Sequence, residues 1–166
     1  MKKWVVGLGV AAVVSMPSWS QEQVQIEVTI PVIEGPMYYR PYVSVWVEDQ
    51  QGDVIKNLAV WSKEPDWLKD MRRWWRKTGR YGGDDIDAVS GATKRPGVYE
   101  LVWDGRDASG NPVKPGQYSL HFEAAREHGS RSWVHTTIEV GAGQHLYTIE
   151  PSEELGEIRI TTGVVQ

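Results

Sequence analysis

The residues best placed to do chemistry lie in one polar segment, Asp87-Ala88-Val89-Ser90-Gly91-Ala92-Thr93. Gly91 and Ala92 carry almost no side chain, so the active site of another protein could close over this backbone. Thr93 offers a hydroxyl, and no general base stands beside it in sequence to make it a nucleophile. The pattern favours a site that accepts a modification. Asp87 could be an oxygen ligand or second-shell acceptor for the magnesium of a modifying enzyme, or it could only stabilise a turn.

The segment before this motif predicts one amphipathic helix over about residues 64–77. Apolar side chains recur at i, i+1, i+4, i+7 and i+8, which is one helical face, and basic side chains fill the other. The apolar face consists of Trp67, Leu68, Met71, Trp74 and Trp75, and the basic residues include Arg72, Arg73 and Arg76. The tryptophans could dock the helix on a core or stack on a planar ligand, and the same side chains could do both.

Residues 78–97, which contain the motif, are expected to form a long exposed loop. This stretch is rich in glycine, carries Asp84, Asp85 and Asp87, and has almost no apolar content. A loop of about twenty residues without secondary structure is uncommon in a compact domain and is usually functional or disordered. The motif therefore lies where chemistry is expected.

The rest of the chain predicts a mainly β fold. Short runs of alternating or β-branched residues are separated by Gly, Pro, Asn and Asp, which is typical of strands joined by turns. The expected strands are residues 24–30, 42–47, 54–61, 98–103, 117–124, 133–140, 145–150 and 157–161. Seven or eight such strands in one domain favour an antiparallel β-sandwich.

The first twenty residues have the pattern of a secretory signal peptide. Lys2 and Lys3 precede an apolar run over 4–14, and Ser18-Trp19-Ser20 supplies small residues for cleavage. A membrane-spanning helix is the alternative, but the run has only about half of the ~20 residues that a bilayer requires. We expect a mature domain over residues 21–166, soluble after signal cleavage and periplasmic. Cysteine is absent, so a lipoprotein anchor is not expected.

Composition excludes several functions. The chain has a net charge of -4, which argues against a nucleic-acid partner. The absence of cysteine excludes disulfides, thiolate metal sites and a nucleophilic cysteine. His121, Glu123, Glu127 and His128 form no tight metal-ligand set, because the last two lie beyond the expected strand end. No Ser-His-Asp order with a nucleophile elbow occurs, so no catalytic residue is assigned.

The motif resembles the flavinylation motif Asp-x-x-Ser/Thr-Gly-Ala-Thr/Ser of the FMN-binding domains in sodium-pumping quinone reductases and Rnf-type complexes. Every defined position matches. In that family an extracytoplasmic, magnesium-dependent flavin transferase of the ApbE type uses FAD to attach FMN through a phosphodiester to the last residue. The resemblance implies that Thr93 carries covalent FMN, and that Asp87, Ser90, Gly91 and Ala92 belong to the same cofactor site.

A second resemblance concerns the fold. Residues 97–118 resemble FlgD-type immunoglobulin-like domains, in which a strand ending in Trp-Asp-Gly, here Trp103-Asp104-Gly105, is followed by a turn and by Pro-Gly-x-Tyr, here Pro115-Gly116-Gln117-Tyr118. Together, the exported sandwich, the Trp-rich helix and the Ser-Gly-Ala-Thr loop resemble, across most of the mature chain, a bacterial periplasmic family of unknown function. That family is associated with ApbE-type transferases and PepSY-type membrane reductases. The resemblance implies an electron carrier rather than a stand-alone enzyme, with the transferase and a PepSY-type reductase or another periplasmic redox protein as partners.

Two functions follow as alternatives. The first is a periplasmic flavoprotein whose ring docks near Trp67, Trp74 or Trp75. The basic residues that could then stabilise the anionic reduced flavin are Arg72, Arg73, Arg76, Lys94 and Arg95. The second is a non-catalytic immunoglobulin-like binding or scaffolding module that uses exposed tryptophans for a sugar or protein partner.

Overall fold

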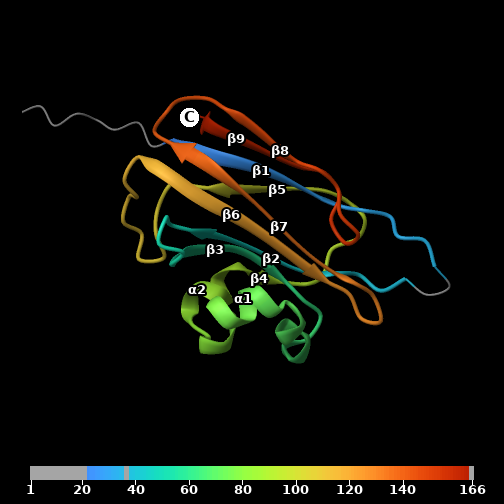
Figure 1. Ribbon diagram of the computed structural model, residues 1–166. Helices are drawn as coiled ribbons and strands as arrows, with labels where there is room; N and C mark the ends of the chain where they lie inside the picture. The colour runs from blue at the N-terminus through green and yellow to red at the C-terminus, as the bar shows by residue number, and fades with distance from the viewer. Residues whose placement is uncertain (1–21, 36–37, 165–166) are drawn as a thin grey trace, which may run out of the picture.

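Two β-sheets packed face to face make up the body of the protein (Figure 1). The computed structural model describes residues 22–35 and 38–164, so the predicted signal peptide, residues 1–20, lies outside the described residues. One sheet has the order β5-β1-β9-β8 and the other β4-β3-β2-β6-β7. The first sheet comprises β1 (Gln23–Ile30), β5 (Gly97–Trp103), β8 (Leu146–Ile149) and β9 (Ile158–Val164). The second comprises β2 (Tyr42–Glu48), β3 (Val54–Trp61), β4 (Ser90–Gly91), β6 (Gly116–Ala125) and β7 (Arg131–Val140).

These strands confirm the predicted mainly β sandwich. Each of the eight expected strands is present, and the structure adds the short β4. The neighbouring strands pair antiparallel, except that β4 runs parallel to β3. The more specific resemblance to an immunoglobulin-like, FlgD-type domain stays a prediction.

The core between the sheets follows from the period-two alternation of the strands. In β1 the side chains of Val24, Ile26, Val28 and Ile30 are all buried and belong to the main apolar cluster. Their partners across the sandwich include Phe122, Leu120 and Ile138. Burying one such side chain contributes about 1.5–3 kcal/mol, so this cluster supplies most of the stability of the sandwich.

Strand β2 is buried on both faces. Val43, Val45 and Val47 point into the core between the sheets, whereas Tyr42 and Trp46 belong to a second apolar cluster on the outer face. This second cluster forms because the helical segment between β3 and β4 packs against that outer face (Figure 1).

The predicted helix over 64–77 is divided in the structure. A 3₁₀ helix, η1 (Pro65–Asp70), is followed by the α-helix α1 (Arg72–Lys77), and Met71 between them has non-helical φ and ψ of -78° and 74°. Met71 is fully buried, and the chain turns there so that α1 begins against the sheet. The amphipathic pattern identified the helical segment correctly, but a single uninterrupted helix was wrong.

The prediction of a long structureless loop over residues 78–97 was wrong. They contain a 3₁₀ helix, η2 (Gly79–Tyr81), an α-helix, α2 (Asp84–Val89), and strand β4. Two apolar residues account for this order, because Ile86 is buried and Val89 packs beside it in the second cluster. Spaced at i and i+3, they anchor one face of α2 to the sheet.

Candidate functional site

The motif Asp87–Thr93 runs from the last turns of α2 into β4. Ser90 and Gly91 pair in parallel with Val60 and Trp61, and the Ser62 amide donates to the Gly91 carbonyl at 2.9 Å. The Ser90 hydroxyl turns back and donates to the Ile86 carbonyl at 2.7 Å, which satisfies a carbonyl at the end of α2. The motif backbone is therefore held at the edge of the five-stranded sheet.

The side chains of the motif face outward. Asp87, Ser90, Gly91 and Ala92 are exposed and Thr93 is half-buried. Within the described part of the chain, nothing forms a hydrogen bond with the Thr93 hydroxyl. The motif therefore presents an exposed backbone with small residues directly before the half-buried Thr93.

A cation stands directly after Thr93. The Lys94 ammonium lies 5.3 Å from the centre of the Trp61 ring and 5.6 Å from that of Tyr99, and the two rings meet edge to face. These distances are within the range of a cation–π contact. The Tyr99 hydroxyl donates to the Arg95 carbonyl at 2.8 Å, while the Arg95 side chain is exposed. Positive charge and aromatic surface thus meet beside the motif.

The aromatic residues of the helical segment lie in the second apolar cluster. Trp74 is fully buried and its indole N–H donates to Asn57 Oδ1 at 2.9 Å. Trp67 stacks on Tyr42, and Trp75 is half-buried beside Trp74. Of the contacts described for these three rings, no hydrogen bond or ring contact involves residues 87–95.

The basic residues of α1 are distributed on different sides. Arg72 and Arg76 are exposed, and the Arg76 Nε donates to the Arg72 carbonyl. Arg73 lies over the Trp133 ring, with its guanidinium carbon 4.0 Å from the ring centre. Of the eight residues expected around a flavin, Lys94 and Arg95 directly follow Thr93 in the chain, and Lys94 contacts Trp61 and Tyr99.

Two polar side chains of the sheet hold the helical segment in place. The fully buried Glu123 on β6 accepts hydrogen bonds from the backbone N–H groups of Arg73 and Trp74, at 3.1 and 2.7 Å, and from Arg131 Nε at 2.6 Å. Asn57 on β3 joins the Trp74 indole to α2, because its Nδ2 donates to Asp85 Oδ2 at 2.9 Å. The motif is thus connected through α2 to α1 and the sheet.

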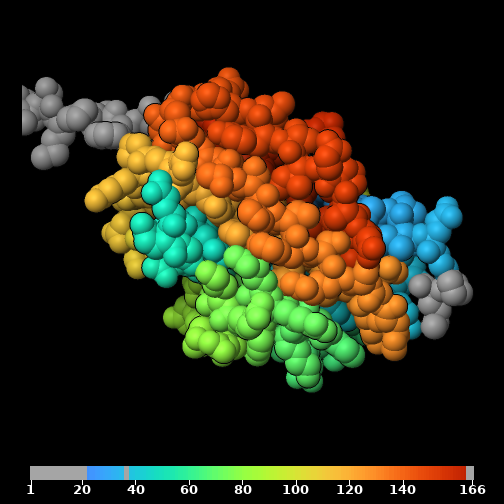
Figure 2. Space-filling model, in the orientation of Figure 1, coloured from blue at the N-terminus to red at the C-terminus, as the bar shows by residue number. Residues whose placement is uncertain are grey.

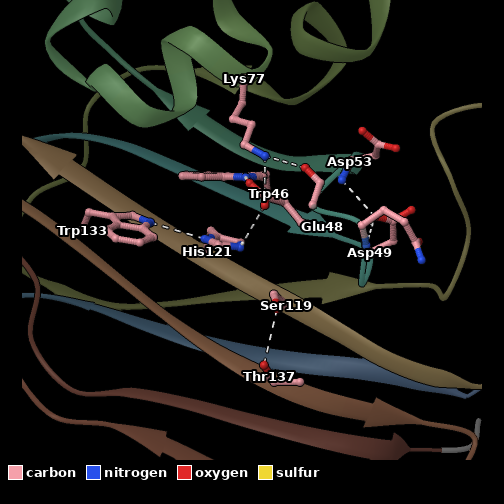
Figure 3. Close-up of polar contacts among 11 residues, drawn as sticks. Trp46, Glu48, Asp49, Asp53, Lys77, Ser119, His121, Trp133 and Thr137 are labelled. Carbon is pink, nitrogen blue, oxygen red and sulfur yellow. Dashed lines mark hydrogen bonds and ion pairs between the residues drawn. The ribbon is translucent and has the colours of Figure 1, made fainter.

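A second constellation occupies the outer face of the same sheet (Figure 3). The near-parallel rings of Trp46, His121 and His135 stand on three adjacent strands, 5.0 and 5.1 Å apart between centres, and Trp133 stacks on both imidazoles. Figure 3 shows Trp46, His121 and Trp133 of this group. Beside them, the buried Glu48 accepts from the Trp46 indole at 2.8 Å and pairs with Lys77 at 3.3 Å.

Comparison with known proteins identifies the family. Residues 23–157 match the family described as "Predicted periplasmic protein (DUF2271)". The chain belongs to this family. A periplasmic location agrees with the export signal expected over residues 1–20. No curated protein and no solved structure matches the chain.

The described part of the DUF2271 chain contains neither a metal-ligand cluster nor a membrane-spanning helix. Among the described residues, no group of three or more His, Cys, Asp or Glu side chains is arranged to hold a metal ion. In the same residues, no helix is long and apolar enough to cross a membrane. Glu127 and His128 do follow the end of β6, as predicted, and leave His121 and Glu123 on the strand itself.

The sequence did not connect His135 with His121, on which it stacks in the structure. The hairpin between β6 and β7 pairs His121 with His135 and Glu123 with Trp133. The two expected strands and the turn residues between them contained the register signal, because side chains directly opposite on one face of a hairpin are neighbours. The ring cluster could have been found by aligning the two strands.

We expect His121 to make folding pH-dependent. Burial lowers its pKa from the ordinary 6.5 to about 4, although Glu48 acts in the opposite direction. Between pH 6.5 and 4, His121 binds a proton in the unfolded chain but stays neutral in the folded one. The free energy of unfolding therefore falls as the pH is lowered through this range, by up to about 3 kcal/mol. Denaturant unfolding between pH 7 and 4.5 should show this loss in the wild type and a smaller loss in His121→Gln.

The exposed His145 provides the control, because His145→Gln should keep the wild-type pH dependence. His145→Gln leaves the other titratable groups unchanged, whereas His121→Gln also removes the ion pair with Glu48. If the wild type and His121→Gln lost the same free energy of unfolding between pH 7 and 4.5, burial of the neutral His121 imidazole would not be the cause of the loss.

Proposed function

We propose that the protein is a periplasmic flavoprotein that carries FMN on Thr93 through a phosphodiester and acts as an electron carrier. The observation that carries this proposal is the complete Asp87–Thr93 motif on an exposed sheet edge with the Thr93 hydroxyl unengaged. In the attachment step the Thr93 oxygen bonds to the FMN phosphorus of FAD, the pyrophosphate bond breaks, AMP leaves, and the hydroxyl proton passes to the transferase.

The residues beside Thr93 suit such a group. Lys94 offers a positive charge where the phosphodiester would be negative, and the half-buried Tyr99 offers aromatic surface to a planar ring, while Trp61 beneath it is buried in the core. The bound flavin would supply one- and two-electron chemistry, while the protein supplies attachment and charge. Lys94 and Arg95 would favour an anionic reduced form of the ring.

Recognition by an ApbE-type transferase is assigned to Asp87. Of the three acids on α2, Asp85 already accepts a hydrogen bond from Asn57, whereas the Asp87 side chain is exposed and belongs to the motif itself. An exposed carboxylate could meet the magnesium of the transferase. A PepSY-type membrane reductase or another periplasmic redox protein would then exchange electrons with the flavin.

Intact mass spectrometry of protein exported together with an active transferase tests the site. We expect the wild type to gain one FMN, less one water, and to keep it after denaturation, because the bond is covalent. Thr93→Ala should lose the adduct completely, whereas Thr148→Ala, which removes an exposed hydroxyl on β8, should keep it. An adduct retained in Thr93→Ala would refute the assignment, and an unmodified wild type would favour the binding or scaffolding module.

The same experiment tests Asp87. Asp87→Ala should reduce labelling at an unchanged melting temperature, because this exposed side chain buries no apolar area. Asp84→Ala is the matched control, since it removes a neighbouring exposed acid outside the motif. A lower melting temperature with full labelling would instead identify Asp87 as a turn stabiliser.

A further inference from the structure

A polar groove of about 530 Å³ opens on the outer face of the five-stranded sheet, where the helical cover ends. Figure 2 shows the segments that border it, the β2–β3 turn in teal, α1 in green and β6–β7 in orange, meeting on the visible face. Its lining includes Glu48, Arg73, Gln117, Ser119, His121 and His135. The volume lies in the range of small-molecule sites.

Two buried nitrogen atoms of this groove donate no hydrogen bond within the described chain, although Glu48 Oε2 lies 3.5 Å from one of them. His121 Nδ1 accepts the Trp133 indole N–H at 3.3 Å, so in the neutral imidazole the proton is on Nε2. His121 is only 3% exposed, and within the described chain its Nε2 has no hydrogen bond. Figure 3 shows the ring with Nδ1 towards Trp133 and its other end towards Glu48 and Ser119.

Arg73 adds the second donor, because its Nε is also buried without a hydrogen-bond partner in the described chain. A buried donor left without a hydrogen bond is destabilising, so a ligand that brings acceptor atoms would recover part of this loss. Both donors belong to side chains that line the same groove.

The charges around the groove exclude ions as good ligands. Glu48 Oε2 lies 3.5 Å from His121 Nε2, so an anion accepting from this nitrogen would meet a carboxylate. A metal ion would need the lone pair of Nε2, but the Trp133 hydrogen bond places the proton there. Glu48 and Asp49 are balanced by Arg73 and Lys77, which favours a neutral ligand.

A hydroxyl group satisfies both atoms at once, because it can accept from His121 Nε2–H and donate to Glu48 Oε2. We propose that this groove is a binding site for a neutral, polyhydroxylated ligand of the saccharide class. The remaining lining suits several hydroxyls, since it offers the amides of Gln50, Gln51 and Gln117 and the hydroxyls of Ser119 and Thr137. The exposed ring of His135 supplies a flat wall for the C–H face of a sugar.

Titration of the exported protein with maltose and with N,N′-diacetylchitobiose, followed by the imidazole proton NMR signals, tests this proposal. We expect saturable shifts of His121 and His135 with at least one of the two, at a Kd on the order of 1 mM, and no shift of His145. His135→Ala and Gln117→Ala change exposed side chains, so both should fold and weaken binding by about tenfold. His145→Ala, an exposed histidine outside the groove, is the control and should bind normally.

Three results would overturn the proposal. They are the absence of a saturable shift with either sugar, binding that survives both groove substitutions, and tighter binding of inorganic phosphate or zinc chloride to the same histidines. The measurement does not depend on the flavin, because Thr93→Ala should give the same titration. Failure here and failure of flavinylation are therefore separate outcomes.

Discussion

Replacing Trp74 with alanine should lower the free energy of unfolding by about 3–5 kcal/mol. The Trp74 side chain is fully buried, and its indole N–H donates a hydrogen bond to Asn57. Its ring fills the space beside Gly79. Alanine would leave a large cavity and an Asn57 oxygen without its donor. Urea unfolding monitored by far-UV circular dichroism would measure the loss.

Trp75 is the matched control, because it is the next residue of the same helix but only half-buried. Trp75→Ala should lower the free energy of unfolding markedly less, by about 1 kcal/mol.

Lys94→Ala should show the reverse pattern. Its free energy of unfolding should change by about 0.5 kcal/mol or less, but the fluorescence and redox potential of a flavin on Thr93 should change. If Trp74→Ala changed the flavin signal at unaltered stability, this tryptophan would be a flavin contact and not core.

The strands were predictable because their signal is local. Alternation, β-branched residues and turn residues mark each of the eight expected runs, and every one became a strand. Strand β4 carries no such signal, because Ser90 and Gly91 pair only where α2 places them beside Val60 and Trp61. A two-residue edge strand depends on tertiary position and not on its own composition.

The helical segment shows where periodicity stops being informative. The spacing of Trp67, Met71 and Trp74 correctly indicated one apolar face. The first amides of α1 after the break at Met71, however, donate to Glu123, which is 50 residues from Arg73 in the chain. Likewise, Ile86 and Val89 are too few to reveal α2 in a glycine-rich stretch. A short motif could therefore be identified by resemblance, whereas the elements that hold it needed the structure.

The structure also places an aromatic residue beside the motif that proximity in the sequence did not suggest. Sequence proximity placed the helix before the motif and so favoured Trp67, Trp74 and Trp75 as its aromatic neighbours. The parallel pairing of β4 with β3 instead brings Trp61, the last residue of β3, opposite Gly91. Contacts across a sheet join residues that are thirty positions apart, and no spacing rule within the motif could supply them.

Glu123→Ala should also lower the free energy of unfolding by about 3–5 kcal/mol, because removing one partner of a buried ionic group leaves the others unpaired. The substitution would remove the acceptor for the Arg73 and Trp74 amides and the ion-pair partner of Arg131. Since these amides begin α1, the helical segment should loosen first, and amide hydrogen exchange should increase there before the sandwich strands are affected.

Glu123→Gln separates charge from hydrogen bonding, because the amide keeps an acceptor oxygen for the helix but loses the ion pair with Arg131. We expect it to cost about half as much as alanine. Glu127→Ala, which removes a partly exposed acid just beyond the same strand, should cost less than about 0.5 kcal/mol. A small effect of Glu123→Ala would mean that apolar packing alone holds α1. Faster exchange confined to α1 and α2 at intact strands would show that one carboxylate fixes the whole segment that presents Thr93.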